Sequence, residues 1–460
     1  MTASRFGLIL VGLLVQNNLL ATIWPVGQGK TYETPSQVAN LVAKGDTVSI
    51  DAGEYVGDVA FWKADQLLLT CPNGQAHLNA NGNSAGQKAI WVIQGDDITV
   101  EHIEFSHCTV PDKNGAGIRQ EGTNLTVRHC HFHDNENGIL AGNDANSTIL
   151  VEYSEFGSNG YGDGYSHNIY VNHVARFIFR YNYSHDSQIG HLVKSRAHQN
   201  FILYNRLDSG PGSGVSYEVD LPNGGLSFLI GNQVDQPQDG ANSALVSYGQ
   251  EGLSNPGPHQ FYAINNTMVN RKTVGRFFSL NGSAQLFKAW NNLLAGGGDM
   301  TSEAALVMDT VRNFLFTDPL DAGFVDVLNG DVHLLPGSPA IDQGLDPEFA
   351  DTIPLYPAEQ YVHPASREGR PQNGLLDIGA YEGPLINATD QEDAGPDVRL
   401  WRAGSMLGSQ GLQEGDVIEC WSLTGQCLVR TNALQPEIPV QPFVVVIYRH
   451  QARLMARLVP

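Results

Sequence analysis

The sequence predicts an all-β chain built mainly as a solenoid and followed by a small C-terminal β-domain. A short strand-like segment recurs about every 24 to 30 residues, turns rich in Gly and Asn separate the copies, and no helix-length amphipathic pattern lies between them. A unit of this length cannot bury its apolar face alone, so successive copies must stack. The clearest copies begin at Ile98, Leu125, Ile149, Phe177, Phe201, Leu226, Phe261 and Leu286.

An asparagine follows five successive copies, at Asn182, Asn205, Asn232, Asn266 and Asn292. Asparagine suits a sharp turn between strands, and coils stacked about 4.8 Å apart would let the amides bond in a ladder. This pattern resembles the right-handed parallel β-helix of pectate-lyase-like proteins that act on polysaccharides. The other repeat folds need a helix, a leucine-spaced consensus or a repeat of about 40 residues.

The resemblance implies a β-helix over residues 22–383. Residues 22–55 are expected to form an N-terminal cap, with a short helix from Pro35 to Ala43, and the first coil. Residues 314–383 resemble the closing segment of secreted bacterial β-helix proteins, which implies a cap over the open end of the solenoid. A polar linker at 384–396 precedes the C-terminal β-sandwich at 397–460.

Both termini predict export. Residues 1–21 have one positive charge, an apolar stretch and a small final residue, as a secretory signal peptide does, and no other apolar run approaches the length of a membrane span. The last 64 residues, with Ser-Leu-Thr-Gly-Gln at 422–426, resemble the sorting domain of type IX secretion in Bacteroidota. The usual Tyr-Pro-Asn-Pro opening is replaced by Leu-Trp-Arg-Ala at 400–403. The resemblance implies a secreted or cell-surface protein that meets this secretion machinery; a monomer is expected.

Composition limits the partners. The formal net charge is −22, from 48 acidic and 26 basic residues, which argues against nucleic acid and against anionic membranes. A polyanionic substrate would need a local basic site. The five cysteines show no metal-binding spacing. Cys108 and Cys130, 22 residues apart, are expected to lie on neighbouring coils, as two buried thiols or, in the alternative, as a disulfide.

Polar side chains concentrate in the second strand of four consecutive coils. Successive side chains of a strand point to opposite faces. If the residues Val193, Ser195, Val219 and Leu221 point inward, their neighbours point outward, and these are Lys194, Arg196, Glu218 and Asp220. A 24-residue offset then predicts two outward columns. The first contains Tyr170, Lys194, Glu218 and Tyr248, and the second contains Asn172, Arg196, Asp220 and Gln250.

Such a strip could be only a set of surface ion pairs, each stabilising by about 0–1 kcal/mol. The clustering of ionisable groups in a chain with 16% charged residues instead favours a functional cleft. Around the two columns we expect catalytic roles for His167 and His191. The expected substrate-binding residues are Asn168, Asn172, His173, Tyr217, Tyr248, Gln250 and Glu251.

The reaction predicted for this strip is β-elimination on a uronate-containing glycan. It needs a base, a cation for the carboxylate and an acid for the leaving oxygen. Lys194 is the expected base and Arg196 the carboxylate clamp, while Tyr170 or a histidine supplies the acid or replaces Lys194. Lys194, Ser195 and Asn200 resemble the Lys-Ser-x-x-Asn motif of the alginate lyase and chondroitinase B family, with a longer spacing and without its Arg-His-Gly motif.

Two other functions stay open at this stage. Glu218 and Asp220, two residues apart on one strand, would sit roughly 6–7 Å apart and could act as the carboxylate pair of a glycoside hydrolase. A non-catalytic glycan-binding or adhesin solenoid requires no special residues. The sequence identifies no cofactor with certainty, and the one considered is Ca²⁺, with Glu218, Asp220 and Glu251 as its ligands.

Overall fold

The computed structural model describes residues 21–384 and six segments of the C-terminal part, which are 399–403, 406–410, 416–422, 427–431, 443–449 and 452–459. The predicted signal peptide, apart from Ala21, and nearly all of the predicted linker lie outside the described residues.

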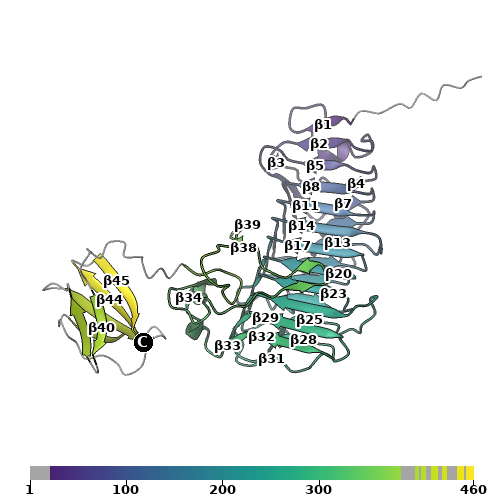
Figure 1. Cartoon of the computed structure of the whole chain (residues 1–460). Coiled ribbons are helices and arrows are strands. Elements are labelled where there is room, and N and C mark those ends of the chain that lie inside the picture. Colours follow the sequence, from purple (N-terminus) through teal and green to yellow (C-terminus); the bar gives the residue numbers. More distant parts are fainter. Residues whose placement is uncertain are drawn as a thin grey trace, which may run out of the picture.

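Residues 23–316 form a parallel β-helix whose coils run through three sheets (Figure 1). Sheet A contains β1 Ile23–Val26, β2 Thr47–Ile50, β5 Leu68–Thr70, β8 Ile98–Glu101, β11 Leu125–Arg128, β14 Thr148–Glu152, β17 Arg176–Arg180, β20 Gln199–Leu203, β23 Leu226–Ile230, β26 Gln260–Ile264, β29 Leu286–Trp290 and β32 Met308–Val311.

Sheets B and C complete each coil. Sheet B contains β3 Gly53–Glu54, β6 Ala76–Asn79, β9 Ile103–Ser106, β12 His131–His133, β15 Glu155–Gly157, β18 Tyr183–His185, β21 Arg206–Asp208, β24 Gln233–Gln236, β27 Thr267–Asn270, β30 Leu293–Gly296 and β33 Phe314–Phe316. Sheet C contains β4 Ala60–Trp62, β7 Ala89–Ile93, β10 Ala116–Gln120, β13 Asn137–Ala141, β16 Ile169–Val171, β19 Val193–Ser195, β22 Val219–Leu221, β25 Ala244–Tyr248, β28 Arg276–Leu280 and β31 Asp299–Thr301.

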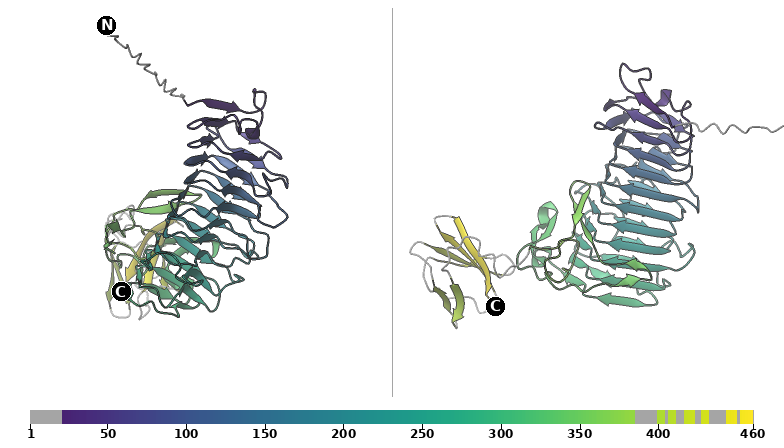
Figure 2. Two further views of the ribbon diagram at one scale, coloured as in Figure 1. Left: turned by 90° about the vertical axis from the view of Figure 1, so that its right-hand side faces the viewer. Right: turned by 45° about the horizontal axis from the view of Figure 1, so that its top comes forward.

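The solenoid predicted from the repeat is confirmed, and its stacked coils are visible in both views of Figure 2. Alternate residues of the strands face the interior, where side chains of one type stack along the axis. The rings of Phe105, Phe132 and Phe156 lie parallel, with centroids 4.9 and 4.8 Å apart. Stacking of identical rows extends the apolar core from one coil to the next.

The predicted asparagine ladder is also confirmed. The main-chain N–H of Asn205 donates to Oδ1 of Asn232 at 3.0 Å, and the N–H of Asn232 donates to Oδ1 of Asn266 at 3.0 Å. The same bond links Asn182 to Asn205, and the ladder continues through Asn292 to Asn313. Each buried amide also donates to the main chain, so the turn between sheets A and B has its polar groups satisfied.

The N-terminal segment contains less helix than expected. The predicted helix is only one 3₁₀ turn, η1 Pro35–Gln37, and the next residues, Val38 and Ala39, are buried in the main core. The chain forms β1 before this turn, and β1 pairs with β2 of the coil that follows.

The closing segment differs from the expected cap. After β33 it forms η2 Pro319–Ala322, β34 Phe324–Asp326, η3 Val327–Asn329, β35 Asp331–Leu334, β36 Phe349–Ala350, β37 Ile353–Pro354, β38 Glu359–Val362 and β39 Ser366–Gly369. It packs on the outer faces of sheets A and B, where Leu355 belongs to one hydrophobic cluster with Tyr204 and Ile378 belongs to another with Leu293. Arg367 reaches back to the hydroxyl of Tyr153 at 2.9 Å. The aromatic outer face of the solenoid therefore determines where this segment lies.

The described C-terminal strands form antiparallel sheets, which agrees with the predicted small β-domain. β40 Arg399–Ala403 pairs with β41 Met406–Gln410. A second sheet has the order β43 Cys427–Thr431, β42 Val417–Ser422, β44 Phe443–Arg449 and β45 Ala452–Val459.

Cys71, Cys108 and Cys130 are free and buried, so Cys108 and Cys130 are thiols as expected. Across the described part of the chain, no helix has the length and apolarity needed to span a membrane.

Candidate functional site

The predicted strip lies on the outer face of sheet C, with one correction to its register. Tyr170 pairs with Lys194 as predicted, but the partner of Lys194 on the next coil is Asp220 rather than Glu218. The reason is turn length. Seven residues (186–192) connect β18 to β19 whereas ten (209–218) connect β21 to β22, and four (172–175) connect β16 to β17 whereas three (196–198) connect β19 to β20, so the net gain is two residues. The coil is therefore 26 residues long at this point, and the column reads Tyr170, Lys194, Asp220, Ser247.

Two cations of the strip converge on one carboxylate. Oε2 of Glu251 lies 2.7 Å from the Arg196 guanidinium, and Oε1 lies 3.5 Å from Nζ of Lys194. Glu251 lies in the turn after β25, and its side chain is 48% exposed. Partial burial opposes its charge, but the hydrogen bonds and positive charges of Arg196 and Lys194 together outweigh this effect and lower the pKa of Glu251.

Lys194 also forms an ion pair with Asp220, in which Nζ lies 3.1 Å from Oδ2. The Asp220 carboxylate is almost fully buried, and this burial raises its pKa although Lys194 pulls it down. Arg196 makes two further contacts, because its Nε donates to the hydroxyl oxygen of Tyr170 at 2.9 Å and its Nη1 donates to Oδ1 of Asn223. Asn223, which follows β22 and is not expected from strand alternation, thus helps to orient the guanidinium group.

Two buried histidines lie behind this surface. The rings of His167 and His191 stack with centroids 4.6 Å apart. Burial, together with the charges of Lys194 and Arg196, lowers the pKa of His167 to about 3. Burial, together with His167 and Lys194, also lowers the pKa of His191. Both rings are therefore neutral at pH 7.

The hydrogen bonds of these rings also define their tautomers. Nδ1 of His167 accepts the main-chain N–H of His191 at 3.1 Å, and Nδ1 of His191 accepts the N–H of Tyr217 at 3.1 Å. A neutral imidazole that accepts at Nδ1 carries its proton at Nε2. Nε2 of His191 accordingly faces Oδ2 of Asp220, at 3.5 Å, as a donor. Neither histidine offers a free lone pair, so neither can serve as the base.

Three predicted site residues do not reach the strip. Glu218 is completely buried, because it lies in the corner just before β22, where strand alternation does not yet apply. Tyr248 pairs with Leu221, faces the interior and donates to the carbonyl of Gly225 at 2.6 Å. Asn168 is also buried and donates to Ser184 Oγ and the carbonyl of His185. Their predicted roles in catalysis or substrate binding are therefore wrong.

The remaining predicted residues lie at the edges. Asn172 and His173 are half-buried after β16, and Nδ1 of His173 lies 3.4 Å from Oδ1 of Asn255. The ring of Tyr217 packs against His191 at 5.4 Å, and Gln250 is exposed in the turn that carries Glu251. These four residues flank the strip and stay candidates for substrate contact.

The carboxylates considered for calcium do not form a cage. Glu218 faces the interior, while Asp220 and Glu251 are engaged by Lys194 and Arg196. A calcium site needs several oxygen ligands around one point. The structure therefore does not bring the three carboxylates considered for calcium together around one point.

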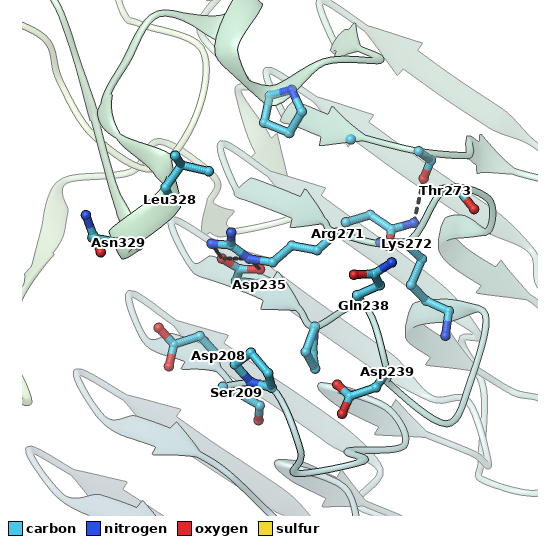
Figure 3. Close-up of a pocket in the computed structure, with 18 of the residues that line it drawn as sticks. Asp208, Ser209, Asp235, Gln238, Asp239, Arg271, Lys272, Thr273, Leu328 and Asn329 are labelled. Atoms are coloured by element: carbon cyan, nitrogen blue, oxygen red, sulfur yellow. Dashed lines mark hydrogen bonds and ion pairs between the residues drawn. The ribbon is translucent and has the colours of Figure 1, made fainter.

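A separate hollow of about 1280 Å³ lies between sheet B and the closing segment (Figure 3). Arg271 forms a bidentate pair with Asp235, at 2.8 and 2.6 Å, and also donates to the carbonyl of Val327 at 2.8 Å. Arg206 pairs with Asp208 at 2.6 Å. Both arginines are paired with carboxylates, and Arg271 also binds the closing segment. We therefore interpret this hollow as part of the packing interface between the closing segment and sheet B.

Comparison with known proteins supports the fold. A family model described as "Right handed beta helix region" matches residues 73–220. The chain is similar to the crystal structure of pectate lyase Pel9A, with 14% identity, a TM-score of 0.54 and coverage of 79% of this chain and 96% of that chain. A structure of the PL6 family alginate lyase AlyGC aligns with 12% identity and a TM-score of 0.32, over 80% of this chain and 59% of that chain. No curated protein matches the sequence.

Proposed function

We propose that the strip on sheet C is the active site of a polysaccharide lyase that cleaves a uronate-containing glycan by β-elimination. The observation that carries this proposal is the convergence of Lys194 and Arg196 on the single carboxylate of Glu251. In the free protein the half-exposed side chain of Glu251 places its carboxylate between these two cations. A uronate carboxylate could take the place of the Glu251 carboxylate. The net charge of −22 makes such a local cationic pair the natural anchor for an acidic sugar.

Arg196 is the carboxylate clamp in this proposal. Its guanidinium is fixed by Tyr170 and Asn223, which leaves Nη2 directed at the bound carboxylate. A guanidinium oriented in this way can donate a charge-assisted hydrogen bond from Nη2 to the carboxylate, and it cannot lose its proton. Neutralising the uronate carboxylate also stabilises the negative charge that develops when the C5 proton is removed.

Proton transfer is then assigned to Lys194 and Tyr170, because the tautomers of His167 and His191 exclude them as bases. After the ammonium group of Lys194 has passed one proton to solvent, its amine takes the C5 proton. The C4–O bond breaks as the C4–C5 double bond forms, and Tyr170 gives a proton to the leaving oxygen. Asp220 positions Lys194 through their ion pair, and the buried histidines lie behind this pair, where His191 contacts Asp220.

The fold similarity to a pectate lyase is consistent with this reaction class. Glu218, the expected partner of Asp220 in a hydrolase, is buried away from the strip, which disfavours the hydrolytic alternative.

The test is a panel of purified polygalacturonate, alginate and glycosaminoglycans, assayed for the ultraviolet absorbance of the unsaturated uronate product. Lys194→Arg keeps the charge but removes the base and should lower kcat by about 10²-fold or more, whereas Arg196→Lys should mainly raise KM. Lys88→Arg, a change in the ion pair with Glu121 on another coil of sheet C, is the matched control.

Three other outcomes would contradict the proposal of a lyase with its active site on this strip. Release of reducing ends without the new absorbance would indicate a hydrolase. Retention on a glycan gel without turnover would indicate a binding protein. Full activity of both strip variants would place the active site elsewhere.

We further infer that the site works outside the cytoplasm. The support is the predicted signal peptide at 1–21 and the resemblance of the C-terminal domain to a type IX sorting domain. Expression in a type IX-competent host with and without residues 397–460 tests this, since the full chain should appear in the medium or at the surface and the truncated chain should stay in the periplasm.

A further inference from the structure

A second strip of ionisable residues, rich in histidine, runs along the outer face of sheet B. On one column His77 pairs with Glu104, Glu104 with His131, and His131 with Glu155. His133 lies on the neighbouring column, next to Ser106 of the previous coil. The segment His131-Phe132-His133 displays the alternation, because the phenylalanine is buried and both histidines are partly exposed. This strip lies on a different sheet from the proposed active site.

Three of these side chains converge on one point. Nε2 of His133 lies 2.9 Å from Oε1 of Glu104, and Nε2 of His77 lies 3.7 Å from the same oxygen. The three atoms that could bind a metal, one from each side chain, all lie within 4.8 Å of one another. No other group of this kind occurs among the described residues. Ligands of a tetrahedral zinc ion at about 2.0–2.1 Å stand about 3.3 Å apart, so small rotations of these side chains would close the site.

The surroundings orient the ligands as a metal site requires. Nδ1 of His133 lies 2.7 Å from Oδ2 of Asp134, so this nitrogen donates to the carboxylate and directs Nε2 toward Glu104. A carboxylate on the far nitrogen of a ligating histidine is a typical supporting contact in zinc sites. Nε2 of His77 contacts the Ser106 hydroxyl at 2.7 Å, and the same hydroxyl lies 2.8 Å from Nδ1 of His107. A metal ion would replace the serine at His77, while the serine would keep its bond to His107.

We propose that His77, Glu104 and His133 form a binding site for one divalent transition-metal ion of the zinc class, with a fourth position open to water. Two imidazoles and one carboxylate favour Zn²⁺ and its neighbours over Ca²⁺ or Mg²⁺, which prefer all-oxygen sets. The ligands come from β6, β9 and β12, three successive coils of the solenoid. The ion would tie these coils together, so its expected role is to stabilise the N-terminal half of the helix.

The competing explanation is a charged His133 held between two carboxylates without metal. His185 is an example of such a histidine in the same chain. Its ring nitrogens contact Asp186 at 2.8 Å and Glu155 at 3.2 Å. The His185 unit has the same Glu, His and Asp arrangement, but no second imidazole joins it within a metal-ligating group. His185 is therefore the matched control for a site that depends on the second histidine, His77.

The experiment is a titration of ZnCl₂ into the full chain purified without a histidine tag and treated with a chelator. Isothermal calorimetry should give one equivalent, and the melting temperature should rise with zinc concentration. His77→Ala, His133→Ala and Glu104→Gln should each remove this binding, and Asp134→Asn should weaken it by about 10–100-fold. His185→Ala should bind zinc as the natural chain does.

Two outcomes would overturn the proposal. One is the absence of saturable binding, and the other is binding that His77→Ala and His133→Ala leave unchanged, which would indicate zinc on scattered surface histidines. Circular dichroism of each apo variant verifies that the β-helix is intact, so a loss of binding cannot be a loss of fold.

Discussion

The ammonium group of Lys194 lies 3.1 Å from Oδ2 of Asp220, its register partner on the next coil. The two side chains are only 12% and 5% exposed, so this is a nearly buried ion pair rather than a surface one. This ion pair fixes the direction of the Lys194 side chain on sheet C, with Nζ also within 3.5 Å of Glu251. The geometry of the proposed active site therefore depends on Asp220.

Asp220→Asn should destabilise the protein by about 1–3 kcal/mol, because it removes the charge that Lys194 was buried against. It should also lower kcat through the loss of Lys194 positioning. Urea unfolding measures the first effect, with Asp112→Asn at an exposed position as the control. An unchanged urea midpoint would show that Lys194 does not need Asp220.

Glu251→Ala should lower KM for a uronate polymer, because the substrate no longer competes with a protein carboxylate for Lys194 and Arg196. An exposed pair is worth about 0–1 kcal/mol, which corresponds to an improvement of up to about fivefold. Initial rates over a range of substrate concentrations measure it. A higher KM would instead give Glu251 the substrate-binding role predicted from the sequence.

Glu218→Gln should stabilise the protein at pH 8 and have little effect at pH 4. Burial raises the pKa of Glu218 well above its usual value, and both carboxylate oxygens lack a partner. Above about pH 4.5 the unfolded chain ionises this group while the folded chain keeps it protonated, which costs about 1.4 kcal/mol per pH unit up to the folded-state pKa. Thermal melts at both pH values test this, and the exposed Glu303→Gln should show no such difference.

His185→Gln should destabilise the protein at pH 6 but not at pH 10. Burial disfavours the charge on His185, but the hydrogen bonds with Asp186 and Glu155 outweigh it and raise the pKa to about 9. The stabilisation is full below about pH 6.5, where the unfolded histidine is also protonated, and is lost as the pH rises through 9. Its size is on the order of 2–3 kcal/mol. A difference in melting temperature that does not vary with pH would contradict this account.

Asn232→Ala should cost on the order of 3 kcal/mol. The side chain is fully buried, accepts from Asn205 and donates to the carbonyl of Ile202, so its loss leaves main-chain groups unsatisfied on adjacent coils. The exposed Asn146 provides the control substitution. Equal unfolding midpoints for the two variants would mean that the ladder contributes little to stability.

The ladder could be predicted because it depends on one residue type at a turn that recurs with the coil. The strip could be predicted only in part. Tyr170, Lys194, Arg196 and Asp220 are outward as expected, whereas Glu218 is buried because the chain has not yet entered the strand. The turn before β22 is three residues longer than the turn before β19, and the turn after β19 is one residue shorter than the turn after β16. The net difference of two residues shifted the partner of Lys194 from Glu218 to Asp220.

The group of His77, Glu104 and His133 escaped prediction for a related reason. Its members are 27 and 29 residues apart, which is the spacing of coils and not of any short metal motif. The one visible signal was the alternating His131-Phe132-His133 segment, which indicates two outward histidines but no partner.

By itself, the sequence determined the solenoid, its period, its turn asparagines and the face of most strands, because these follow from local residue preferences repeated at a regular interval. Only the tertiary structure decided which side chains meet across coils, that Glu218 is internal, and that the closing segment covers the outer faces of sheets A and B. The physical reason is that contacts between coils depend on the register of parallel strands. Turn lengths and packing set that register, and neither has a local sequence signature.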